Sequence, residues 1–161
     1  QPLNYEMIKE ALEERFGGKW QIVIRLHNRL KKESRSWLNL LPSYVSDATF
    51  YEDMQELLLC TDVGLTDYSS WIFDFVLSGK PGFIIELNLE DYENARGFYY
   101  PIDTTPFPIA MNSEELAANI RKFDAEKYEK DKDVFLAARG CMEDGHASER
   151  IVEKINELMA K

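Results

Sequence analysis

The sequence predicts an α/β fold, a Rossmann-like parallel sheet with helices on both faces. Short apolar runs that suit buried strands alternate along the chain with segments of helical periodicity. No repeat, low-complexity tract or interdomain linker interrupts this alternation. The 161 residues are enough to bury one sizeable core. We therefore expect a single Rossmann-like domain over residues 1–161.

The first half of the chain predicts two helices and two strands. Apolar side chains recur at helical spacing from Tyr5, and the pair Gly17-Gly18 ends that helix. Strict alternation then predicts a strand that ends at His27. The expected elements are a helix over 5–16, a strand over 20–27, a polar and basic loop with room for a short helix over 28–42, a weak strand over 44–48 and a helix over 51–60.

The second half predicts further strands and a helical end. Gly79 and Pro81 end the apolar helix that starts at Trp71, and Ser113 is the expected N-cap of a later helix. The expected elements are a strand over 63–66, a helix over 71–77, a strand over 83–85, an aromatic and proline-rich loop over 88–108, and helices over 113–123, 125–138 and 147–159.

Composition narrows the function classes. The formal net charge of −10 argues against nonspecific nucleic-acid binding, although a few local cations still allow a phosphorylated ligand. Cys60 and Cys141 lack metal-ligand spacing, which predicts free thiols in a reducing compartment. No metal motif, bilayer-length apolar stretch or signal peptide is evident. The chain opens on Gln1 and enters a helical pattern at once, so we expect a piece of a longer protein.

The first candidate site is the turn from a strand into a helix at Thr66, Asp67, Tyr68, Ser69 and Ser70. A helix start presents backbone N–H groups and a favourable dipole to an anion, and the two serines add small hydroxyl donors. A helical turn deeper, Asp74 is the only charge of this apolar helix, which suits a ligand hydroxyl. The alternative is that Asp67 or Ser69 only caps the helix and that Asp74 pairs with an arginine.

The second candidate is the pair Arg25 and His27, which alternation places on one side of a strand end. Both could reach an anionic ligand, and His27 could donate to a phosphate or act as an acid. The alternative is a structural histidine beside a surface ion pair.

Two further segments add candidates. Glu143, Asp144 and Ser148 belong to a polar, glycine-containing turn that leads into the last helix, and a plain helix start is the alternative. Arg96 lies in the aromatic loop, where it would offer a cation to phosphate unless the aromatics only form a satellite core.

Together these segments resemble the family of CDP-glycerol glycerophosphotransferases, with four blocks in the right order over nearly the whole chain. The blocks are Arg25-Leu26-His27; Thr66-Asp67-Tyr68-Ser69-Ser70-Trp71-Ile72-Phe73-Asp74-Phe75 with Gly79-Lys80-Pro81; Asp91-Tyr92-Glu93-Asn94-Ala95-Arg96-Gly97-Phe98-Tyr99-Tyr100; and Glu143-Asp144-Gly145 with Ala147-Ser148. Asn28 departs from the proline usual in the family.

The resemblance implies the C-terminal, nucleotide-binding half of a GT-B enzyme that needs no cofactor. Such an enzyme transfers glycerol phosphate or ribitol phosphate from CDP-glycerol or CDP-ribitol to a lipid-linked teichoic acid or related polymer, as a peripheral protein on the cytoplasmic face of the membrane. The N-terminal acceptor domain and the domain's first strand would be missing from this chain.

By the same analogy, His27 and Arg25 contact donor phosphates, with His27 in the catalytic role. The strand-to-helix turn from Thr66 to Ser70 meets the pyrophosphate, and Asp74 meets the ribose or glycerol end. Arg96 and the turn from Glu143 to Ser148 complete the pocket.

Two alternatives stay open at this point. A sugar-nucleotide-dependent GT-B glycosyltransferase shares the phosphate site and differs only in its preferred ligand. A receiver-type signalling module would phosphorylate Asp67, but it needs acidic residues after its first strand, where this chain has Arg25 and His27.

Overall fold

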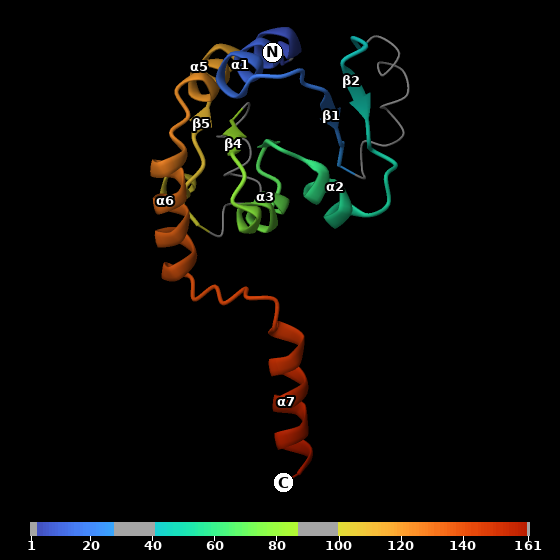
Figure 1. The fold of residues 1–161 in the computed structure, drawn as a ribbon, viewed down its shortest axis with the longest axis vertical. Coiled ribbons are helices and arrows are strands. Elements are labelled where there is room, and N and C mark those ends of the chain that lie inside the picture. The colour runs from blue at the N-terminus through green and yellow to red at the C-terminus, as the bar shows by residue number, and fades with distance from the viewer. Residues whose placement is uncertain (1–2, 28–40, 87–99, 161) are drawn as a thin grey trace.

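The computed structural model describes residues 3–27, 41–86 and 100–160 and shows two parallel sheets (Figure 1). Strand β1 (Ile22–Ile24) pairs with β2 (Val45–Asp47), and the second sheet has the order β3 (Gly64–Thr66), β4 (Gly82–Ile85), β5 (Ile109–Ala110). In register, Ile22 lies opposite Val45 and Leu65 opposite Phe83. Parallel strands joined through helices confirm the predicted α/β class. β1 is shorter than the strand expected over 20–27.

The helices follow the predicted boundaries closely. They are α1 (Tyr5–Phe16), α2 (Met54–Cys60), α3 (Trp71–Phe75), continued by the 3₁₀ turn η4 (Val76–Ser78), the 3₁₀ turn η5 (Ile102–Thr104), α5 (Ser113–Arg121), α6 (Ala125–Ala138) and α7 (Ala147–Met159). The bounds of α1, α6 and α7 are those expected. α2 starts later than expected, because the Asp53 side chain accepts a hydrogen bond from Glu56 N–H and so caps it there.

The core lies around β4, whose four residues are all buried. A strand buried on both faces needs cover on both, which the helices provide. α1 and α5 lie side by side, tied at one end by Asn4 N–H to Ser113 Oγ (2.9 Å) and at the other by Arg15 to the Phe123 carbonyl (Nη2–O 2.8 Å). Arg15 therefore fixes the ends of both helices at the same edge of the domain.

Ser113 is not the N-cap of α5, so that prediction is wrong. The cap is Asn112, whose Oδ1 accepts from Glu115 N–H at 2.8 Å. Ser113 is the first residue of the helix, is buried, and its hydroxyl accepts from Asn4 N–H. Asparagine and serine cap helices about equally well, so tertiary contact with α1 decided which residue took the position.

The aromatic loop expected over 88–108 is followed by a strand that the sequence did not reveal. Ile109–Ala110 forms β5 directly after it, pairing with Ile84 and Ile85 of β4. A two-residue strand is too short for any periodicity to be visible. Residues 88–99 of the loop, and residues 28–40 of the earlier basic loop, lie outside the described residues.

α7 projects from the rest of the domain, joined to α6 by an extended stretch (Figure 1). None of its residues is buried. Across residues 3–27, 41–86 and 100–160, no helix combines the length and apolar character needed to span a membrane.

Candidate functional site

The turn after β3 has an unusual backbone. Thr66 is buried, and its Oγ1 accepts a hydrogen bond from Ser69 N–H at 3.1 Å, which folds the chain sharply back. Tyr68 between them has φ +83°, the left-handed region that a tyrosine enters only at a cost of about 1–3 kcal/mol. Strain of this kind persists where the surrounding structure enforces it, and it is concentrated at functional sites.

The turn leads into α3 without a side-chain cap. Ser70 occupies the N-cap position, but its side chain makes no capping hydrogen bond. Side-chain capping by Ser70 therefore does not explain this segment. Ser69 and Ser70 are both exposed. The amides of Ile72 and Phe73 already donate to the carbonyls of Ser69 (3.4 Å) and Ser70 (3.0 Å). The two exposed hydroxyls at the helix start are therefore the groups that the turn offers to an anion.

His27, which follows β1, lies near Asp67, which follows β3. The protein packed around Asp67 raises the pKa of its carboxyl, and the charge of the nearby His27 partly offsets this rise. Both side chains still reach the surface. The structure thus places one residue of each of the first two predicted groups, His27 and Asp67, near one another at the carboxyl ends of two strands.

Arg25 lies beside this pair but is engaged with the backbone. Its Nη1 donates to the Ala48 carbonyl at 3.2 Å and also to the Tyr51 carbonyl. The surface ion pair considered as an alternative is therefore not what holds it. A guanidinium has five N–H donors, so these two bonds are compatible with a phosphate contact through the others.

Asp74 is exposed on the first turn of α3. Among the described residues no arginine, lysine or histidine pairs with it. No described partner within the protein accounts for a carboxylate at this position, and its contact with a ligand hydroxyl stays a prediction.

The C-terminal group of predicted residues lies at the start of α7. Asp144 accepts from Arg150 Nη1 at 2.8 Å, and this arginine lowers the pKa of the Asp144 carboxyl. Glu143 and Ser148 are exposed. Because α7 projects from the body of the domain (Figure 1), the structure does not gather these residues with His27. Arg96 lies outside the described residues.

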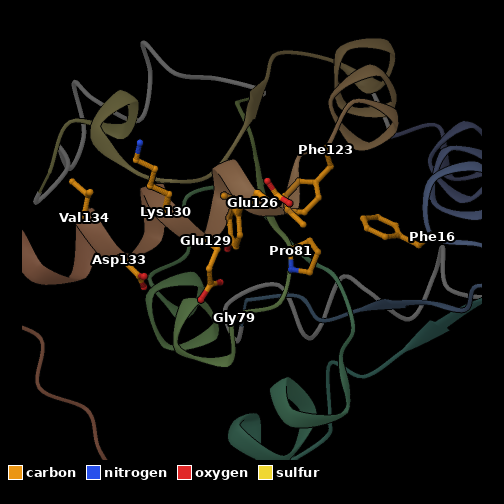
Figure 2. Close-up of a pocket in the computed structure, with 11 residues that line it drawn as sticks. Phe16, Gly79, Pro81, Phe123, Glu126, Glu129, Lys130, Asp133 and Val134 are labelled. Atoms are coloured by element: carbon orange, nitrogen blue, oxygen red, sulfur yellow. The ribbon is translucent and has the colours of Figure 1, made fainter.

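A groove is also present elsewhere in the described part of the chain (Figure 2). It has a volume of about 720 Å³ and lies beside Phe16, Pro81 and Phe123. Pro81 precedes β4 and Phe16 precedes β1, so the groove is at the amino ends of the strands, opposite the predicted site. Within the described residues no three or more His, Cys, Asp and Glu side chains cluster as metal ligands would.

Sequence reasoning missed Thr49, which is fully buried next to the site. Its Oγ1 accepts from Leu26 N–H at 3.1 Å, directly before His27. The two residues are far apart in sequence, and a lone threonine after a weak strand gives no local signal of such a contact.

The fold and the turn define a class: a Rossmann-like α/β domain with an anion-accepting strand-to-helix turn beyond the carboxyl ends of its strands. The model of the family described as CDP-Glycerol:Poly(glycerophosphate) glycerophosphotransferase matches residues 3–157. The chain belongs to this family.

Curated relatives and solved structures agree with this family assignment. The chain is 35% identical to the teichoic acid poly(ribitol-phosphate) polymerase of Bacillus spizizenii over 81% of this chain and 23% of that protein. It is 31% identical to the teichoic acid glycerol-phosphate transferase of Staphylococcus aureus over 95% of this chain and 39% of that one. It therefore spans between about a quarter and two-fifths of these relatives.

A structure of the wall teichoic acid polymerase TagF matches with a TM-score of 0.68 and 25% identity, over 96% of this chain and 38% of that chain. A variant of TagF soaked with CDPG matches with a TM-score of 0.68 and 26% identity, over 94% of this chain and 38% of that one. The matches confirm the predicted fold and family.

Proposed function

We propose that this domain supplies the CDP-donor site of an enzyme that transfers glycerol phosphate or ribitol phosphate to teichoic acid or a related polymer. Family membership and the names of the relatives support the reaction class. The structure supports the location of the donor site, because the uncapped start of α3 lies where open α/β sheets bind their ligands.

The single observation that carries the proposal is the turn from Thr66 to Ser70. The Ser70 side chain makes no capping bond, the hydroxyls of Ser69 and Ser70 are exposed, and His27 lies near Asp67 of the same turn. A diphosphate at this position would accept hydrogen bonds that the protein itself does not use. Asp74, one turn deeper, would receive a hydroxyl of the ribose or glycerol end.

The chemistry at such a site is a displacement at phosphorus. An acceptor hydroxyl attacks the β-phosphorus of CDP-glycerol, the bond from that phosphorus to the bridging oxygen breaks, and CMP leaves. In this proposal His27 donates a proton or a hydrogen bond to the departing phosphate, and the helix start stabilises charge on the remaining oxygens. Arg25 and Arg96 would add positive charge.

The relatives are longer than this chain, which leaves room for further parts of the enzyme. We assign the lipid-linked acceptor polymer, and the base that activates its hydroxyl, to a second domain that this chain does not include. Peripheral attachment at the cytoplasmic face of the membrane would then bring the donor site to the acceptor. The turn from Glu143 to Ser148 would complete the donor pocket if α7 is held against the domain.

Calorimetric titration tests the donor site directly. We expect the chain to bind CDP-glycerol and CMP in preference to UDP-glucose. Ser70→Ala and His27→Asn should each weaken binding about tenfold, the effect of one charge-assisted hydrogen bond. Ser43→Ala is the matched control, because Ser43 is exposed just ahead of the amino end of β2, away from the carboxyl ends of the strands.

Preference for the uridine ligand would replace the proposal with a sugar-nucleotide transferase. Equal binding by the parent and by Ser70→Ala and His27→Asn would show that the donor lies elsewhere.

A further inference from the structure

We propose that Thr49 is a positioning residue that sets His27 against Asp67 at the donor site. The importance of this role rests on the proposed function, but the contacts themselves do not. These contacts are hydrogen bonds between the end of β1 and the loop that follows β2.

The backbone hydrogen bonds between β1 and β2 stop one bond earlier than the regular parallel pattern predicts. Ile22 N–H donates to the Tyr44 carbonyl at 2.8 Å, and Ala48 N–H donates to the Ile24 carbonyl at 2.8 Å. In a parallel pair the same period of two would bring Leu26 N–H to the Ala48 carbonyl.

Two side chains replace that bond. Leu26 N–H donates to Thr49 Oγ1 at 3.1 Å instead. The Ala48 carbonyl accepts from Arg25 Nη1 at 3.2 Å, and the same nitrogen also reaches the Tyr51 carbonyl. The chain is thus turned out of the strand by side-chain bonds directly before His27, while its backbone groups stay satisfied.

Thr49 is itself held firmly. It is 0% exposed, so its hydroxyl has no water to exchange with. Its own N–H donates to Asp47 Oδ1 at 2.8 Å, which fixes the turn that carries it. A buried acceptor in a fixed turn defines the position of the Leu26 amide, and His27 is the next residue along the chain.

The consequence is a defined approach of His27 to Asp67. Because β1 has only three residues, its ladder alone would leave the strand end free to fray. Without the Thr49 hydroxyl, the Leu26 amide would be left without its partner in a half-buried position. His27 would then sample positions away from Asp67 and from the turn at Ser69 and Ser70.

The test compares Thr49→Val, which keeps the shape and removes the acceptor, with Thr49→Ser, which keeps the acceptor. Three quantities are measured on each variant: hydrogen exchange of the Leu26 amide, the pKa of the Asp67 carboxyl by carbon NMR, and affinity for CDP-glycerol. His27→Gln supplies the reference for complete loss of the histidine.

We expect Thr49→Val to speed exchange at Leu26 at least tenfold and to shift the Asp67 pKa upward, in the same direction as His27→Gln. Affinity should fall about fivefold to tenfold, as for one lost hydrogen bond. Thr49→Ser should restore all three quantities. Should Thr49→Val fail to fold, Thr49→Cys, a weak acceptor of similar size, carries the same expectations.

The proposal is overturned if Thr49→Val leaves the Asp67 pKa at the parent value, whatever happens to stability. It is also overturned if Thr49→Ser behaves like Thr49→Val. Failure of the parent chain to bind CDP-glycerol would count against the proposed function alone, since exchange at Leu26 and the titration of Asp67 still report on positioning.

Discussion

Replacing Gly64 by alanine tests the packing beneath the candidate site. Gly64 is the first residue of β3, and a Cβ added to it would lie 2.7 Å from both Cδ1 and Cε1 of Phe75 and 3.2 Å from Trp71. Carbon atoms in contact are normally about 3.5–4.0 Å apart, so roughly 1 Å must be gained. Phe75 is 1% exposed and has no open space to move into.

Overpacking of this kind costs about 1–3 kcal/mol, and we expect about 2 kcal/mol for Gly64→Ala. For a domain of this size that lowers the melting temperature by roughly 4–8 °C, measurable by thermal and urea unfolding. Phe75→Leu shortens the obstructing ring, so the double variant should be at least about 1 kcal/mol more stable than the sum of the two changes. A melting temperature within 1 °C of the parent for Gly64→Ala, or simple additivity in the double variant, would refute this reasoning.

Three further changes test other parts of the structure. Lys80→Met should lower the free energy of unfolding by about 1–2 kcal/mol, because Lys80 Nζ donates to the carbonyls of Leu59 (2.8 Å) and Thr61 (2.7 Å) at the end of α2. Equal stability of the variant and the parent in urea unfolding would contradict this. Burial raises the pKa of the Asp67 carboxyl, so the stability linked to its proton is fully present below the ordinary Asp pKa and is lost as pH rises through the raised pKa of the folded state. Asp67→Asn should therefore gain stability relative to the parent between about pH 3 and about pH 7, and a stability difference that is the same at both pH values would contradict this. Deleting residues 147–161 should change the free energy of unfolding by less than about 0.5 kcal/mol, because α7 buries no side chain, and a clear fall in melting temperature would show that α7 packs on the domain.

The parts of the fold that the sequence predicted are those with strong local signals. α1 has its Asn4 cap and a glycine end, and α6 and α7 have long periodic runs. β5 has two residues and depends on its pairing with β4, which no local pattern shows. The local sequence does not distinguish Ser113 from Asn112 as the cap of α5; the hydrogen bond from Asn4 N–H, next to α1, to the Ser113 hydroxyl does.

For the candidate site too, the residues with local sequence signals were predictable and those that depend on distant contacts were not. The turn at Ser69 and Ser70 was predictable, because a short apolar run followed by small polar residues and a helix marks the end of a strand. Thr49 was not predictable, because its contact with Leu26 depends on how β1 and β2 end relative to one another. The backbone bonds of Arg25 were hidden for the same reason.

Helix capping distinguishes the candidate site from the rest of the molecule. Of the six described α-helices, four begin with an aspartate or asparagine side chain that caps an amide; the four caps are Asn4, Asp53, Asn112 and Asp124. The two without such a bond are α3, which begins after Ser70, and α7, which begins after His146. A side-chain cap contributes about 1 kcal/mol, so this chain uses caps readily where nothing else needs the helix start. The two uncapped helix starts are also the two that follow sequence blocks of the family, and at α3 the strained Tyr68 and the raised pKa of Asp67 add further costs to stability. Costs gathered at the start of α3, while four other helix starts are capped, are what a domain shows when the missing partner of those groups is a ligand.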